Sequence, residues 1–159
     1  MKEEKEAGLI RKSEISDIDM LWDLIEEIHK KQEKILLYED FNTRHTKETL
    51  ARFIEQGSDT ERIWVSCLDK KIIGFIDIEY KAADYLFFDD KYVFIRYFYV
   101  EQNEKELSQQ LMNVAIEDAK QYGFEYVCGD MLANDTVMEE LYEKNNFERY
   151  RIRLAKELE

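Results

Sequence analysis

The chain has 159 residues, of which 45 % are hydrophobic and 13 % aromatic, enough for one folded domain with a sizeable core. Its 36 acidic residues outnumber the 23 basic ones and give a formal net charge of −13, so its surface repels nucleic acid and anionic membranes. Such a surface attracts cationic partners, including amines, and it repels a polyanionic nucleotide unless a local basic patch offsets the field.

The sequence gives no sign of a membrane anchor or a metal site. No apolar run reaches the length of a membrane span, and the opening residues MKEEKEAG do not resemble a signal peptide, so we expect a cytoplasmic protein. Cys67 and Cys128 each lie inside an apolar stretch and are expected to be buried free thiols. His29 and His45 stand apart from both cysteines, so the spacing predicts no metal site.

The first third of the chain predicts a short strand and two helices. Leu9–Arg11 is the candidate strand. Ser16 and Asp19 resemble a capping box, and apolar residues at helical spacing follow them to about Lys31. A second helix is predicted over about 46–57, between a threonine that can cap it and a glycine that can end it.

The middle of the chain predicts three strands. Arg62–Leu68 and Ile72–Tyr80 are separated by a tight turn at 69–71, which indicates a hairpin. A loop over 81–91 leads to Tyr92–Val100, a run of aromatic and β-branched residues that is typical of a buried strand.

The last third predicts a helix, a strand and another helix. Apolar residues recur at helical spacing from Leu107 to Tyr122, and Gly123 is placed to end that helix. Phe124–Leu132 reads as a strand and Asp135–Asn145 as an amphipathic helix. A final half-buried strand is predicted where apolar residues alternate with arginines, at Tyr150, Ile152 and Leu154.

The order of these elements is β α α β β β α β α β, with hairpins first and strand–helix–strand crossovers after them. This order predicts an α/β (α+β) fold with a mixed sheet and helices on its faces. No linker or repeat interrupts the pattern, so we expect a single domain over 1–159, with 1–8 as a frayed tail.

Several segments resemble the GNAT superfamily of acetyl-CoA-dependent N-acetyltransferases, over Ile10 to Leu158. LYEKNNF, at 141–147, is similar to the LYEKLGF that the family carries near its C-terminus. IIGFIDIEY, at 72–80, is similar to the third strand, and YFYV with the following helix and strand is similar to the fourth strand, helix and fifth strand. The resemblance implies a mostly antiparallel mixed sheet flanked by helices.

The resemblance also implies a reaction and a site. In the family, acetyl-CoA lies in a V-shaped split between the fourth and fifth strands, an amine attacks the thioester, and a tyrosine protonates the departing thiolate. Tyr142 matches that tyrosine, and a phenol with a pKa of ~10 can act as general acid toward a thiolate whose thiol titrates near ~8.5. The alternative is that Tyr142 is a core aromatic on a helix face. The positions that match cofactor-binding residues are Phe98, Val100, Lys105, Glu106, Leu107, Ser108, Asn134 and Tyr142.

The turn after the fourth strand departs from the family signature Q/R-x-x-G-x-G/A. The two glycine positions hold Glu106 and Ser108, the turn is about two residues shorter, and it contains no arginine. The glycines let backbone N–H groups approach a pyrophosphate. Loss of two such charge-assisted bonds would cost roughly 3–6 kcal/mol of binding free energy.

A second departure concerns the general base. Arg96 occupies the position where similar members carry a glutamate, and an arginine stays protonated. Asp77, Glu79 and Asp130 lie on strands that would border the split, and Glu79 is our candidate base. Arg96 could instead pair with one of these carboxylates.

Two hypotheses of different classes follow, beside an unrelated α/β domain that mimics the pattern. The first is an N-acetyltransferase that transfers acetyl from acetyl-CoA to a primary amine of a small cationic substrate. The second is a catalytically inactive GNAT-fold protein that acts as a binding, regulatory or subunit-partner module. Under the first we expect a small cationic amine as partner, no nucleic acid, no membrane, and potentially a homodimer.

Overall fold

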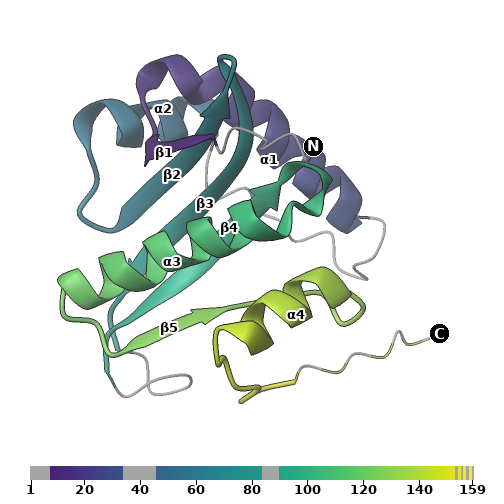
Figure 1. Ribbon diagram of the computed structural model, residues 1–159. Helices are drawn as coiled ribbons and strands as arrows, with labels where there is room; N and C mark the ends of the chain where they lie inside the picture. Colours follow the sequence, from purple (N-terminus) through teal and green to yellow (C-terminus); the bar gives the residue numbers. More distant parts are fainter. Residues whose placement is uncertain are drawn as a thin grey trace, which may run out of the picture.

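A computed structural model describes residues 8–33, 46–83 and 90–152, together with Leu154, Lys156 and Leu158. Within these residues, five strands form one sheet in the order β1-β2-β3-β4-β5 (Figure 1). The first three junctions are antiparallel and the last, between β4 and β5, is parallel. The predicted α/β class with a mostly antiparallel mixed sheet is confirmed.

The elements follow the predicted order up to residue 144. The strands are β1 (Leu9–Lys12), β2 (Glu61–Leu68), β3 (Lys71–Lys81), β4 (Tyr92–Val100) and β5 (Tyr126–Gly129). The helices are α1 (Ile18–Glu33), α2 (Lys47–Gln56), α3 (Lys105–Gln121) and α4 (Thr136–Lys144), with 3₁₀ turns at η1 (Ile15–Asp17) and η2 (Glu101–Asn103). β5 is shorter than the predicted 124–132.

Helices cover both faces of the sheet. α3 crosses one face, α1 and α2 lie on the other, and α4 lies beside β5 (Figure 1). Because side chains alternate along a strand, β2–β4 supply two cores. The α3-side core is built from residues such as Ile76, Val93, Ile95, Leu111 and Met112. The α1-side core is built from residues such as Leu21, Leu50, Val65 and Phe75.

Local sequence signals set the turns. Asp69 and Lys70 both have positive φ, 49° and 64°, as a two-residue hairpin turn requires, so Lys71 already belongs to β3. Gly123 follows α3 with a φ of 71°, a conformation that glycine adopts without strain.

The start of α1 differs from the prediction. Ser16 lies inside η1, and the capping carboxylate is that of Asp17, which accepts the Glu14 N–H at 2.7 Å. Arg11 of β1 donates two bonds to the same carboxylate, at 2.7 and 2.9 Å. The acidic residue of the cap is therefore Asp17, which the ion pair with Arg11 holds in place, and not the predicted Asp19.

The predicted final strand is wrong. The described residues from 148 onward form no strand, and Tyr150, Ile152 and Leu154 are 57 %, 74 % and 89 % exposed. Alternation along a chain buries side chains only where the segment joins a sheet over a core, and the described residues here lie in no strand of the sheet.

Three further expectations concern the N-terminal tail, the loop at 81–91 and membrane spans. Residues 1–7 of the predicted tail lie outside the described residues. Gly8, its last residue, is buried, and a Cβ added to it would lie 2.5 Å from the Oγ of Ser66 in β2. The predicted loop at 81–91 falls partly outside them, at 84–89. No helix among the described residues is long and apolar enough to cross a membrane.

Candidate functional site

The sheet opens between β4 and β5. These strands pair from Tyr92 opposite Tyr126 to Ile95 opposite Gly129, where the ladder ends. The cause lies in β4: Tyr97 stands opposite Asp77 and Ile95 opposite Ile78, which leaves Arg96 as an extra residue on β4. Such a β-bulge bends its strand and increases its twist.

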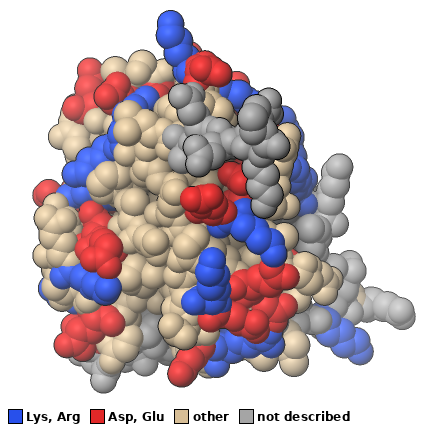
Figure 2. All heavy atoms as spheres, in the orientation of Figure 1, with Lys and Arg blue, Asp and Glu red and all other residues tan. Residues whose placement is uncertain are grey.

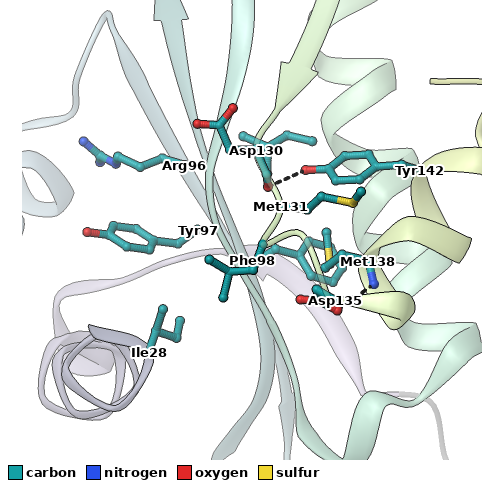
Figure 3. A pocket seen from close by; sticks show the side chains of 11 residues that line it. Ile28, Arg96, Tyr97, Phe98, Asp130, Met131, Asp135, Met138 and Tyr142 are labelled. Atoms are coloured by element: carbon teal, nitrogen blue, oxygen red, sulfur yellow. Dashed lines mark hydrogen bonds between the residues drawn. The ribbon is translucent and has the colours of Figure 1, made fainter. Parts of the chain in front are cut away.

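The bulge also places two consecutive side chains of β4 on one face of the sheet. Ile95 and Phe98 contact the α3-side core, whereas Tyr97 contacts the α1-side core. Arg96 contacts Asp77, which lies between two residues of the α3-side core and therefore faces α1. Arg96 and Tyr97 thus both extend from the face of the sheet that α1 covers, at the place where the split begins (Figure 3).

Two hollows occupy the split. The inner pocket, of about 100 Å³, is lined by Ile28, Ile95, Arg96, Tyr97, Phe98, Asp130, Met131, Leu132, Asp135, Met138 and Tyr142 (Figure 3). The outer groove, of about 710 Å³, runs between the start of α3 and α4. Phe98 and Met138 line both hollows, so the outer groove leads to the inner pocket.

Tyr142 of α4 lines the inner pocket with its phenol. Its hydroxyl donates to the carbonyl oxygen of Asp130 at 3.4 Å, and its ring contacts Phe147 with 4.9 Å between ring centroids. A Cβ on Gly129 would lie 2.2 Å from the Tyr142 Oη, so only glycine at this position of β5 leaves room for the phenol. Burial, followed by the charge of Asp130, raises the pKa of Tyr142, so the phenol keeps its proton at any physiological pH.

A buried ionic cluster lies behind Arg96. The Arg96 guanidinium donates to Asp77 Oδ2 from Nε at 3.1 Å and from Nη2 at 2.8 Å, and Nη2 also donates to Glu61. The side chain of Asp77 is 1 % exposed and that of Glu61 is 5 % exposed. The expected pairing of Arg96 with a neighbouring carboxylate is confirmed.

Burial dominates the titration of this cluster. It raises the pKa of Glu61 to about 8, with the Asp77 charge adding to the rise and Arg96 opposing it. Burial also raises the pKa of Asp77, and Arg96 opposes that rise. Glu61 therefore holds the proton of the pair near pH 7, and the charge of Arg96 is balanced by Asp77 inside the protein.

A second polar contact joins the inner pocket to α1. The hydroxyl of Tyr97 lies 2.7 Å from Nε2 of His29, a buried residue of α1. Burial raises the pKa of Tyr97, so this phenol also stays protonated. Sequence reasoning did not connect the two residues, because a histidine on an amphipathic helix carries no sign of its partner.

The start of α3 faces the outer groove. Its N-cap, Glu104, makes no side-chain capping bond, and the first three helical N–H groups, at 105–107, precede the residue whose N–H begins the helical ladder. That residue is Ser108, whose N–H and hydroxyl both donate to the Glu104 carbonyl at 2.9 Å. Gln102 and Asn103, which have φ of 54° and 52°, line the groove before the helix.

The groove carries a local excess of positive charge. Among the described residues that line it, the charged ones are Lys31, Lys105, Lys144, Asp135 and Glu140. Lys105 donates to Glu140 across the groove at 2.9 Å, between two exposed side chains. Elsewhere on the face shown in Figure 2, acidic and basic side chains are interspersed.

The acidic residues of the turn point elsewhere. Glu101 pairs with Lys71 at the start of β3. Glu106 is exposed and does not line the groove, whereas Lys105 and Ser108 do.

The predicted site residues are distributed over both hollows and the core. Phe98, Val100, Lys105 and Ser108 line the outer groove. The Leu107 side chain is buried in the α3-side core, and the Asn134 side chain is exposed outside both linings. Glu79 pairs with Lys81 at 3.1 Å and lies outside both linings. Lys31, Lys144, Tyr97 and His29 are the site residues that the sequence did not indicate.

The described part of the chain holds no group of three His, Cys, Asp or Glu side chains placed to bind a metal ion. Neither Cys67 nor Cys128 forms a disulfide; Cys128 is buried, as expected, and Cys67 is half-buried. Burial raises the pKa of Cys67.

Comparison with known proteins identifies a family. Residues 19–147 match the model described as the acetyltransferase (GNAT) family. No curated protein matches the sequence. Among solved structures, a mutant of the BH1408 protein from Bacillus halodurans is similar with a TM-score of 0.77 and 13 % identity, over 94 % of this chain and 99 % of that one.

Two acetyltransferases share the same architecture. The aminoglycoside acetyltransferase meta-AAC0020 from an uncultured soil metagenomic sample, in complex with trehalose, has a TM-score of 0.68 and 17 % identity, over 95 % of this chain and 96 % of that one. The aminoglycoside N-acetyltransferase AAC(6')-Iy in complex with CoA has a TM-score of 0.70 and 14 % identity, over 97 % of both chains. Likeness at such low identity establishes the fold.

Proposed function

This chain belongs to the GNAT acetyltransferase family, and we propose that it transfers the acetyl group of acetyl-CoA to a primary amine of a small cationic substrate. The observation that carries the proposal is the split between β4 and β5. It opens beside a helix start with no side-chain cap and leads to a pocket that contains a buried, protonated tyrosine.

The outer groove fits the chemistry of acetyl-CoA. Backbone N–H groups at a helix start bind phosphate oxygens, and the helix dipole favours negative charge there. Lys31, Lys105 and Lys144 add positive charge from three different helices. The volume of about 710 Å³ lies within the range typical of cofactor sites. Beyond Ile95, the edge of β4 that has left β5 can present backbone N–H and C=O groups to the amides of the pantetheine arm.

The altered turn is compatible with this binding mode. Backbone N–H groups do not depend on the side chain, and the carboxylate of Glu106 lies outside the groove, so it does not oppose a phosphate there at short range. Lys105 can exchange its exposed bond with Glu140 for a phosphate at little cost, because exposed ion pairs contribute only ~0–1 kcal/mol. A helix start without a side-chain cap supports cofactor binding over the alternative of an inactive GNAT-fold module.

The inner pocket fits a cationic amine. Arg96 is the basic residue in its lining, and Asp77 balances that charge from within the protein. Asp130 and Asp135 remain as carboxylates of the lining, which favours an ammonium group over an anion. Bound acetyl-CoA would supply an acetyl group activated as a thioester.

Tyr142 is proposed to assist the departure of the thiolate. Its pKa lies further above that of a thiol than for a free phenol, so complete proton transfer is uphill. A neutral phenol held in a dry site instead stabilises the thiolate as a fixed hydrogen-bond donor. This role combines the two expectations for Tyr142, because the ring packs as a core aromatic while the hydroxyl reaches the pocket.

Calorimetric titration with acetyl-CoA tests the cofactor site. We expect wild-type protein to bind, and Lys144→Glu to bind at least about tenfold more weakly, because an attractive charge becomes repulsive. Lys70→Glu, in the β2–β3 turn and outside the groove, is the matched control and should bind like wild type. Folded wild-type protein that gives no binding heat at high micromolar acetyl-CoA would refute the proposal.

Thiol release in the presence of a panel of small polyamines and of acidic amino acids, which carry an amine and a net negative charge, tests the acceptor class. Turnover with the polyamines, and none with the anionic acceptors, is the expected pattern. The homodimer and the cytoplasmic location remain predictions, to be checked by light scattering of the purified protein and by imaging of a tagged copy.

A further inference from the structure

An ammonium group must lose a proton before its nitrogen can attack a thioester. We propose that Tyr97 and His29 remove this proton together, with the Tyr97 phenol touching the amine and the His29 imidazole receiving the proton through it. The inference rests on the proposed function and adds the base that the reaction requires.

The geometry links the pocket to the imidazole in a single step. Tyr97 lines the inner pocket and points toward α1, next to Ile28 (Figure 3). Its hydroxyl and Nε2 of His29 are 2.7 Å apart, and the ring centroids are 5.5 Å apart at an interplanar angle of 55°. In the tautomer whose Nε2 is unprotonated, the phenol donates and the imidazole accepts. Proton transfer along this bond needs no movement of either side chain.

The carboxylates that sequence reasoning put forward are less suited to the task. Asp77 is 1 % exposed and is held by two bonds from Arg96, so an amine in the pocket cannot reach it. Glu79 pairs with Lys81 outside both linings. Asp130 lines the pocket with an exposed carboxylate, which can hold an ammonium group there.

The proton and the bonding electrons balance across the step. The amine passes one proton to the Tyr97 oxygen as the Tyr97 proton moves to Nε2, so the phenol is neutral before and after and the imidazole becomes imidazolium. The amine lone pair forms the N–C bond to the acetyl carbon, the C–S bond breaks, and the sulfur leaves as a thiolate that accepts a hydrogen bond from Tyr142. The nitrogen then loses its remaining excess proton to water, and the imidazolium returns its proton to solvent before the next cycle.

The surrounding charges allow the imidazole to become positive. The Arg96 guanidinium carbon lies 5.6 Å from the centre of the Tyr97 ring and opposes a new positive charge. Asp77 from β3 faces the same side and favours it, whereas Glu61 from β2, which also faces this side, carries its proton near pH 7. On α1 itself, Glu26 lies one turn before the histidine and accepts a bond from a tryptophan at the surface. The Asp77 carboxylate therefore offsets the arginine.

The pH dependence of acetyl transfer separates a proton acceptor from a structural contact. His29→Gln keeps a side chain that can hydrogen bond to Tyr97 but cannot take up a proton. We expect wild-type kcat/KM to fall on the acidic side with a slope of one, in the range where imidazoles titrate. In His29→Gln this limb should disappear and kcat should fall by about 100-fold, the usual contribution of a general base. Tyr97→Phe should lose the limb and the rate in the same way.

Two further variants serve as comparisons. Asp130→Asn should raise KM for the amine and keep the acidic limb, because it weakens ammonium binding and leaves the base in place. Tyr80→Phe removes a phenol that donates to Asp118 far from the pocket, and it should keep the wild-type profile. Acetyl-CoA affinity, measured by calorimetry, should be unchanged in His29→Gln.

The outcomes distinguish the two proposals. If the wild type binds acetyl-CoA and transfers acetyl, and His29→Gln keeps both kcat and the acidic limb, the role of the Tyr97–His29 pair is overturned while the proposed function stands. If Asp130→Asn abolishes the limb, Asp130 is the base and the pair is again overturned. If the wild type neither binds acetyl-CoA nor acetylates any amine, the proposed function falls and the pair has no reaction to serve.

Discussion

Substitution of Gly129 by alanine should displace Tyr142. The new Cβ would lie 2.2 Å from the Tyr142 Oη, 3.1 Å from its Cζ and 3.2 Å from the Ile95 Cβ. Contact at 2.2 Å cannot persist, and the ring cannot retreat freely because Phe147 lies against it. We therefore expect the phenol to leave its place and its bond to Asp130 to break.

The cost can be worked out from these contacts. Overpacking a core costs about 1–3 kcal/mol, and the lost hydrogen bond adds about 1 kcal/mol. The lower entropy of alanine in the unfolded chain returns about 0.4–1 kcal/mol. The net loss in free energy of unfolding is thus about 1–3 kcal/mol, and kcat should fall at least as far as it does in Tyr142→Phe.

A double-mutant cycle isolates the clash. Tyr142→Phe alone loses the hydroxyl and about 1 kcal/mol, but in the Gly129→Ala background it removes the atom at 2.2 Å and leaves only the 3.1 Å contact. The second substitution should therefore be neutral or stabilising there. The assay is urea unfolding of all four proteins, followed by far-ultraviolet circular dichroism. Strict additivity, or a Gly129→Ala protein within 0.5 kcal/mol of wild type, would refute the reasoning.

Four more predictions follow from the site. Glu61 keeps its proton in the folded protein up to about pH 8 and ionises near 4.5 when unfolded, so the wild type should lose stability as pH rises through this window, on the order of 3 kcal/mol between pH 5.5 and 8.5. Glu61→Gln should flatten the dependence in urea titrations at pH 5.5 and 8.5. Arg96→Met should lower the free energy of unfolding by about 3–5 kcal/mol, because it leaves buried carboxyl groups unpaired; a loss under 1 kcal/mol would contradict this. Tyr142→Phe should lower kcat by about 10–100-fold, and no alkaline limb in the wild-type rate below pH 10 should belong to this tyrosine. Glu106→Gly should change the acetyl-CoA Kd less than threefold, since this side chain lies outside the groove; a tenfold tightening would show that its charge does oppose the cofactor.

Strong periodicity made most of the fold predictable. The apolar run of β4 and the helical spacing of α3 predicted both elements close to their observed bounds. The pattern of apolar residues in each segment fits either a strand or a helix but not both. The alternation at Tyr150 and Ile152 has the same form, but the two residues lie in no strand and their side chains are exposed. Alternation of apolar and polar residues shows that a segment could form a half-buried strand. Whether the segment is buried depends on pairing with another strand in the folded protein.

The site was less predictable because its residues come from separate elements. Lys31 lies on α1 and Lys144 on α4, and their place beside the start of α3 depends on how the helices pack on the sheet. The bulge at Arg96, which turns it and Tyr97 toward the same face, depends on the register with β3. Neither fact has a local sequence signal.

The orientation of Glu106 did have such a signal. Leu107 and Leu111 are four residues apart and face the core, whereas Lys105 and Ser108 are three residues apart and line the groove. Glu106 follows neither spacing, so helical periodicity alone turns it toward solvent.

Loss of the motif glycines should therefore weaken phosphate binding less than loss of the backbone N–H groups would. A signature records side chains, whereas an anion at a helix start is held by backbone dipoles and by whatever cations surround them. The chain has a net charge of −13, but the described lining of the outer groove contains three lysines and two acidic residues. The three lysines come from three different helices. An altered turn within a conserved architecture should thus be judged by the direction of its N–H groups and by the charge of the surrounding groove. By both criteria we expect this turn to bind a phosphate.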